Sequence, residues 1–261
     1  MVSPAQTTEV KDAMRAFYAS EAGDRDSDEW LRQGGTARVP EPKAAHYFID
    51  RKVETAVALA GAPAQSRVLE VGCSFGHMTF LLTQRFREVV AVDISPESIA
   101  LASRRADHYG VGNVRFLEAD AERLEAFRAG EFDAVMSFST LRFCPHPEAA
   151  LDEMFRVAAP GARVVVDVPN LNCPWYGPIK RGIGLEAHVH DRLFDRREIE
   201  TLMRGAGFED VVTRHILFTS KRMPSALLPI SRLMDRVLEP LPGIRGMSGI
   251  IMAGGRKPAR R

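Results

Sequence analysis

From Arg67 onwards, short apolar runs alternate with longer amphipathic stretches. The apolar runs predict buried strands at Val68–Val71, Val89–Val92, Val114–Leu117, Phe132–Phe138 and Ala162–Val168. The amphipathic stretches predict helices at Phe75–Phe86, Pro96–Tyr109 and Glu148–Ala158. Because short strands that alternate with such helices form right-handed βαβ units, we expect an α/β fold with a doubly wound, mostly parallel, Rossmann-like sheet.

The pattern changes on both sides of this alternation. Apolar positions at helical spacing predict helices near residues 9–20 and 44–60, so we expect residues 1–65 to form a helical lid or cap. Residues 66–261 would form the main domain, with insertions near 169–194 and 221–246. In that part the sequence predicts helices at 195–205 and 227–238 and strands at 211–218 and 249–254. The last two strands follow each other closely, so we expect an antiparallel edge strand and seven strands in all.

Composition excludes several classes of protein. Lys and Arg total 35 and Asp and Glu total 34, a net charge of +1 that argues against nucleic-acid binding. No apolar stretch approaches the ~20 residues that span a bilayer, and the first residues lack the apolar core of a signal peptide, so we expect a cytoplasmic protein. Cys73, Cys144 and Cys173 form no Cys-x-x-Cys pair, so we expect neither a disulfide framework nor a metal site.

The strongest local signal is the turn after the first predicted strand, Glu70-Val71-Gly72-Cys73-Ser74-Phe75-Gly76. In an open α/β sheet the ligand crevice lies beyond the carboxyl ends of the strands, where this turn falls. A glycine at 72 lets the backbone approach a ligand closely. The Gly-x-Gly-x-x-Gly fingerprint that serves a pyrophosphate is absent, and Glu70 suits a cationic ligand instead. A tight strand–helix turn with no ligand is the alternative.

Two more acidic residues follow successive strands. Asp93 ends the second predicted strand about twenty residues after Gly72, where a carboxylate can accept from both hydroxyls of a ribose. Asp120 follows the third strand, where it can accept from an adenine amino group. Either residue alone could instead cap a helix. Their order along the chain, after Glu70, favours a nucleoside site.

The ordered series Glu70-x-Gly72-x-x-x-Gly76, Asp93, Asp120 and Phe132-Asp133-Ala134-Val135 resembles the motifs of class I methyltransferases, which use S-adenosylmethionine (SAM). The resemblance covers about Arg67 to Val168. It implies that SAM is the methyl donor and that the expected contacts follow the order of the motifs. They are Glu70, Gly72, Cys73 and Gly76 for methionine, Asp93 and Ile94 for ribose, Asp120 and Ala121 for adenine, and Ser137 and Phe138 beside the methyl group.

The segment after Val168 resembles small-molecule methyltransferases of the quinone-biosynthesis type, through Asn170-x-Asn172, His188-x-His190, Phe194 and Ala206-Gly207-Phe208. The resemblance implies a small-molecule acceptor, and we expect methylation of a hydroxyl. The Asn/Asp-Pro-Pro-aromatic motif of nucleobase methyltransferases is absent. C- or N-methylation of a small metabolite, or a nonenzymatic SAM-binding partner protein, stays open. An NAD oxidoreductase is disfavoured by the missing fingerprint.

The acceptor side has fewer signals. His188 and His190 are the candidate catalytic bases, since imidazole titrates near neutral pH. Hydrogen bonds to loop backbone, or a His-x-His metal pair without a third ligand, are the alternatives. The candidate contacts to the acceptor are Tyr18, Leu141, Asn172 and Asp191.

The predicted helix at 227–238 has an apolar face with interspersed arginines. Packing on the sheet or on a second subunit would explain that face, so the protein would be a monomer or a homodimer. Peripheral contact with a membrane surface is the other interpretation, and it would suit a lipophilic acceptor.

Overall fold

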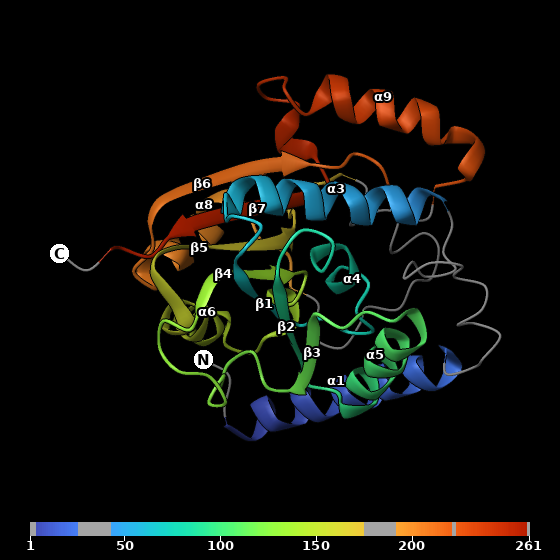
Figure 1. Ribbon diagram of the computed structural model, residues 1–261. Helices are drawn as coiled ribbons and strands as arrows, with labels where there is room; N and C mark the ends of the chain where they lie inside the picture. The colour runs from blue at the N-terminus through green and yellow to red at the C-terminus, as the bar shows by residue number, and fades with distance from the viewer. Residues whose placement is uncertain (1–3, 26–42, 175–191, 221–222, 260–261) are drawn as a thin grey trace.

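The computed structural model describes residues 4–25, 43–174, 192–220 and 223–259. A seven-stranded sheet with the order β3-β2-β1-β4-β5-β7-β6 forms its centre (Figure 1). The strands are β1 (Arg67–Val71), β2 (Glu88–Asp93), β3 (Val114–Glu118), β4 (Phe132–Phe138), β5 (Ala158–Pro169), β6 (Glu209–Ile216) and β7 (Ile250–Arg256). Strands β1 to β5 pair in parallel. This confirms the doubly wound, mostly parallel sheet.

The last two strands complete the sheet beyond β5. β7 pairs antiparallel with both β5 and β6, so it lies between them and β6 forms the edge. The predicted antiparallel pair at this edge is confirmed. The inserted helix of that prediction is α9 (Leu228–Leu238), which lies between β6 and β7 along the chain.

Helices cover both faces of the sheet (Figure 1). The described helices are α1 (Pro4–Arg25), α3 (Lys43–Ala60), α4 (Thr79–Leu82), α5 (Pro96–Tyr109), α6 (Pro147–Val157), α8 (Arg196–Gly205) and α9. Short 3-10 turns occur at Leu141–Phe143, Ser225–Leu227 and Arg245–Met247. In these parts of the chain, no helix has the length and apolar character that crossing a membrane requires.

The core is divided between the two faces because successive strand residues point to opposite sides. Leu69 of β1 packs in the cluster that α6 and α8 cover, through Met154 and Met203. Its neighbour Val68 packs in the cluster that α3 covers, through Val53. Both side chains are fully buried. Strand β1 therefore buries apolar side chains on both faces of the sheet, as its apolar run indicated.

The predicted helix at Phe75–Phe86 is wrong in extent, because only Thr79–Leu82 is helical. Ser74 and Gly76 have φ of 47° and 79°, in the left-handed region that a right-handed helix excludes. The chain therefore begins its helix after Gly76. After Leu82 it turns again, as the bond from Arg85 N–H to Leu82 C=O shows.

The other predicted helices match the structure within one residue at each end, except that α1 extends five residues beyond the predicted 9–20 at both ends. Helix α5 spans the predicted residues, with Ser95 as its N-cap and Gly110 in the left-handed conformation at its end. Helix α8 starts after the predicted cap Asp195, whose side chain accepts from the Glu198 N–H. Helix α1 lies beside α5 and beneath the sheet edge that carries β3 (Figure 1). Its Lys11 contacts Asp120, which follows β3, so α1 lies near the carboxyl end of that strand.

Candidate functional site

The strand order reverses between β1 and β4, which places a crevice at the carboxyl ends of these strands. Val71 ends β1 and pairs with Val92 of β2 on one side and Ser137 of β4 on the other. Asp93, the last residue of β2, pairs with Glu118 of β3. The turns that follow these strands therefore meet at one edge, which is where the candidate site lies.

The turn after β1 needs glycine at position 72. Its φ is 80°, and an added Cβ would lie only 2.0 Å from Thr140 Oγ1. The N–H groups of Gly72 and Cys73 both donate to the Val92 carbonyl, at 2.8 and 2.9 Å. Thr140 Oγ1 and Ser137 Oγ both donate to the Val71 carbonyl, at 3.0 and 2.9 Å. Strands β1, β2 and β4 are thus tied together at the floor of the site.

Asp93 organises the loops on either side of it. Its Oδ2 accepts from the Ser74 N–H at 2.8 Å and its Oδ1 accepts from the Ser95 N–H at 3.0 Å. Burial raises the pKa of the Asp93 carboxyl, against the opposing effect of these N–H groups. Each carboxylate oxygen can accept a second bond, so Asp93 can hold a ligand without releasing the backbone.

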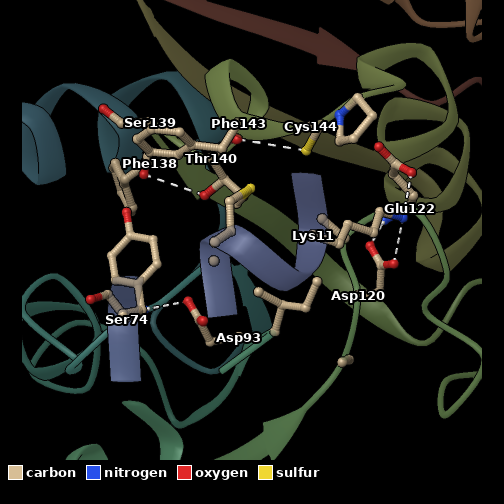
Figure 2. A pocket seen from close by; sticks show the side chains of 17 residues that line it. Lys11, Ser74, Asp93, Asp120, Glu122, Phe138, Ser139, Thr140, Phe143 and Cys144 are labelled. Carbon is tan, nitrogen blue, oxygen red and sulfur yellow. Dashed lines mark hydrogen bonds and ion pairs between the residues drawn. The ribbon is translucent and has the colours of Figure 1, made fainter. Parts of the chain in front are cut away.

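Asp120 forms an ion pair with Lys11 of the N-terminal helix α1. Lys11 Nζ lies 2.6 Å from Asp120 Oδ2 and 2.6 Å from Glu122 Oε2 (Figure 2). Burial alone would lower the pKa of Lys11, but the two carboxylates outweigh it and raise that pKa. Asp120 Oδ1 also accepts from the Glu122 N–H. A residue that precedes the sheet by more than fifty positions is therefore part of this site.

Glu70 lies behind the glycine turn, fully enclosed. It is 1% exposed, and its Oε2 accepts from Thr79 Oγ1 at 2.6 Å. Burial raises the pKa of Glu70 to about 8, although Thr79 opposes the shift. At neutral pH the carboxyl is therefore protonated in part, and a cation placed beside it would favour its ionised form.

A buried polar network lies at the end of β4. Lys52 of α3 places Nζ 3.0 Å from Asp167 Oδ1 and donates to Ser139 Oγ at 2.9 Å. Ser139 Oγ in turn donates to Asp167 Oδ2 at 3.0 Å. Lys52 and Asp167 are at most 2% exposed, whereas Ser139 lines the pocket. The backbone of Ser139 has φ 58°, a strained conformation that points to a constrained functional position.

Gly72, Asp93, Asp120 and Ser139 border one pocket (Figure 2). With the open space at its mouth it encloses about 680 Å³. Seven of the residues predicted from sequence line it: Tyr18, Gly72, Asp93, Ile94, Asp120, Ala121 and Phe138. The structure also brings in residues that sequence reasoning missed, namely Lys11, Met14, Ser74, Ala119, Glu122, Ser139, Thr140, Phe143, Cys144 and Pro145.

Five predicted site residues lie behind the lining. Glu70, Cys73, Ser137 and Leu141 are buried, and Gly76 packs against Phe80 and Phe116. Asn172 is exposed, and its N–H donates to Asn170 Oδ1. His188, His190 and Asp191 lie outside the described residues. No group of three metal-ligating side chains occurs in the ranges that the structure describes.

Comparison with known proteins finds a family model that matches the central part of the chain. The profile of the family described as "Methyltransferase domain" matches residues 69–166, the part of the chain that forms β1 to β5. Over these residues the chain is similar to methyltransferase domains. The match covers the glycine turn, Asp93 and Asp120 together.

Relatives of this chain include enzymes named for quinone biosynthesis. The chain is 43% identical over 114 residues to a demethylmenaquinone methyltransferase of Thermus thermophilus, covering 42% of this chain and 50% of that protein. It is 26% identical over 190 residues to a ubiquinone biosynthesis O-methyltransferase of Psychrobacter arcticus, covering 69% and 72%. The match thus spans only half the length of the first of these relatives.

Solved methyltransferases share the fold. Magnesium protoporphyrin IX methyltransferase from Synechocystis PCC 6803, with bound SAH, superimposes with a TM-score of 0.64 at 18% identity. The superposition covers 95% of this chain and 99% of that one. At this identity the likeness extends to the fold, and the acceptor has to be inferred from the site.

Proposed function

We propose that this protein transfers the methyl group of SAM to a small-molecule acceptor. The observation that carries the proposal is the arrangement of Asp93 and Asp120 in one pocket beside the Gly72 turn. Two carboxylates at successive strand ends suit a ligand with ribose hydroxyls at one point and an amino group at another. The only lysine among the described lining residues, Lys11, is already paired with carboxylates, so the pocket offers little to a pyrophosphate.

The residues of the pocket fit SAM in each of its parts. Asp93 would accept from the ribose hydroxyls, and Asp120 would accept from the adenine amino group. The apolar side chains of Ile94, Ala119 and Ala121 would enclose the adenine ring. Glu70 would counter the cationic amino group of the methionine part from behind the turn. Each role follows from the chemistry of the side chain and its position in the pocket or, for Glu70, directly behind it.

Bound SAM supplies a methyl group on a positively charged sulfur. The protein has to align the acceptor with that methyl group and exclude water, since the charge disperses as the reaction proceeds. The aromatic rings of Phe138 and Phe143 line the pocket where we expect the methyl group to lie (Figure 2). Helix α1 contributes Met14 and Tyr18 to the same lining, which supports a role for residues 1–65 as a lid.

A hydroxyl acceptor is the form of the reaction that we favour. Ser139 Oγ already donates its proton to Asp167 and accepts a bond from Lys52, so one lone pair of Oγ is left to accept from an acceptor hydroxyl. This would orient the hydroxyl oxygen in the pocket. The proton itself would pass to His188 or His190, the bases expected from the sequence.

Methylation of a ring carbon is the second candidate. The 36% identity over 115 residues to a ubiquinone/menaquinone biosynthesis C-methyltransferase of Pseudomonas fluorescens favours it, since that protein's name gives carbon as the methylated atom. Both candidates share a ring that carries hydroxyl or keto oxygens. A quinol would offer Ser139 the same hydroxyl contact.

The experiment is methyl transfer from labelled SAM to a panel of phenols, catechols and reduced naphthoquinones, with the product analysed by mass spectrometry. We expect a labelled product, with the methyl group on oxygen. A methyl group on carbon would select the second candidate. If a folded protein that binds SAM labels no member of the panel, a nonenzymatic SAM-binding role replaces the proposal. Ser139→Ala should raise KM for the acceptor while the Kd for SAM stays unchanged.

A further inference from the structure

Helix α9 packs on the protein through its polar side. Its buried residues are Leu228, Ser231 and Asp235. Asp235 accepts hydrogen bonds from the Phe218 and Thr219 N–H groups and from Thr219 Oγ1, at 2.6, 3.1 and 2.6 Å. A carboxylate with this many donors needs no apolar contact to stay buried. The helix is thus held by a polar anchor.

The opposite side of α9 is apolar and exposed. Ile230, Leu233 and Val237 are 60%, 59% and 48% exposed, and Met234 lies between them at 40%. Their spacing of i, i+3, i+4 and i+7 forms one continuous stripe on the helix. We call these four residues the α9 stripe.

The apolar exposure continues past the helix. Among the described residues, eight of the ten exposed large hydrophobic side chains fall between Leu227 and Met247. The four outside the stripe are Leu227, Leu241, Ile244 and Met247. Figure 1 shows α9 at the outer margin of the molecule, beyond α3. Such a concentration of exposed apolar side chains marks an interaction surface rather than random exposure.

The exposed charges beside the stripe are cationic. Arg232, Arg236 and Arg245 are all exposed. Of the two acidic residues in this segment, Asp235 is buried, and Glu239 is paired with Arg51 at 2.5 Å. The surface therefore combines an apolar stripe with a positive margin.

The combination of an apolar stripe with a positive margin distinguishes between two possible binding partners, a second copy of this chain and a lipid surface. A second copy packed stripe to stripe would bring its arginines near those of the first, and like charges at an interface are unfavourable. An anionic lipid surface complements both features, because acyl chains accept the apolar side chains and phosphates accept the guanidinium groups. An eleven-residue helix is about 16 Å long, which suits lying in the surface and not crossing it.

We propose that α9 and the segment to Met247 bind the surface of an anionic membrane. Binding would bring the protein to the phase in which a lipophilic acceptor dissolves. It needs neither SAM nor an acceptor, so it goes beyond the proposed function, and its test does not depend on that function.

The test is co-sedimentation with vesicles of phosphatidylcholine alone and of phosphatidylcholine with about 30% phosphatidylglycerol. We expect the full-length protein to bind the anionic vesicles at least tenfold more tightly, and to release them as salt is raised. Ile230→Ser with Leu233→Ser should abolish binding. Arg236→Gln with Arg245→Gln should weaken it on anionic vesicles. These side chains are exposed, so folding should be retained, and circular dichroism would check it.

Val212→Ser provides the control, since this side chain is exposed and apolar and lies on β6 opposite Gly254 of β7, outside the segment that we propose to bind. This control should bind as the wild type does. Failure of the wild type to bind anionic vesicles overturns the proposal, and so does unchanged binding of the stripe variant. A concentration-dependent dimer that the stripe variant loses would assign the surface to a second copy instead.

Discussion

Lys11 Nζ lies 2.6 Å from Asp120 Oδ2, so the N-terminal helix is ion-paired to the carboxylate that we assign to the adenine amino group. The pair is partly buried, with side-chain exposures of 14% and 21%. Helix α1 is therefore fixed over the pocket by a contact made at the adenine end. A ligand at Asp120 and the position of α1 should influence each other.

Lys11→Ala should loosen α1. The change leaves Asp120 and Glu122 without their shared cation, a loss we set at about 1–3 kcal/mol. Amide hydrogen exchange in α1 should then be faster, by about tenfold for each 1.4 kcal/mol of stabilisation that is lost. Arg15→Ala is the matched control, because Arg15 pairs with Asp12 on the same helix in an exposed position. Equal protection of α1 in both variants would mean that Lys11 does not hold the helix.

Glu70 predicts a dependence of stability on pH. Its pKa is about 8 in the folded protein and 4.5 in the unfolded reference. The folded state therefore binds the extra proton, so the contribution of Glu70 to stability is complete below pH 4.5 and is lost as the pH rises to 8. Against Glu70→Gln, which does not titrate, the free energy of unfolding of the wild type should fall by up to about 1.4 kcal/mol per pH unit. Urea unfolding at pH 5.5, 6.5 and 7.5 measures this. A constant difference between the two proteins contradicts the account.

Lys52→Met should be strongly destabilising. It leaves Asp167 buried without its counter-charge, a loss that typically costs about 3–5 kcal/mol. Arg51→Ala removes the neighbouring, partly exposed pair with Glu239 and should cost less than about 1 kcal/mol. Thermal unfolding of the two variants compares them directly. Similar losses would show that the buried network does not stabilise α3 on the sheet.

Gly72→Ala should destabilise the folded protein by more than the cost of the left-handed backbone conformation alone. The new Cβ would meet Thr140 Oγ1 at 2.0 Å, in a backbone conformation that L residues rarely adopt. Gly110→Ala has the same kind of positive φ with nothing within 4 Å, so it should cost only the roughly 1–2 kcal/mol of the left-handed conformation. Thr140→Gly should restore part of the stability that Gly72→Ala loses. If the two alanine variants unfold alike, the contact with Thr140 is unimportant.

The sequence predicted the sheet better than the surroundings of the pocket. Asp93 could be found because strand ends and glycine turns follow local rules of spacing and periodicity. Lys11 could not be found in this way. A lysine on a predicted helix is expected to be exposed, and the local sequence does not indicate a partner more than a hundred positions away. The buried pair of Lys52 and Asp167 was missed for the same reason. Polar residues within predicted apolar elements, such as Asp167 in β5, were the available signal.

The α9 stripe shows a different limit of sequence reasoning. Its amphipathic pattern was visible, but periodicity alone does not say which face is packed inward. The structure places Ser231 and Asp235 inward because Asp235 finds backbone donors at Phe218 and Thr219. Packing of the apolar face on the sheet, one of the expected explanations, is wrong for these residues.

We expect the pocket at Asp93 and Asp120 to bind SAM. Calorimetric titration with SAH, the demethylated product, measures this binding without turnover. In titrations at two temperatures, we expect one binding site for SAH, with a Kd in the micromolar range. In Asp93→Ala, binding should be weaker by about 1–3 kcal/mol, because the hydrogen bonds to the ribose are lost. No binding by a folded wild type, or an equal Kd in the variant, would contradict the account.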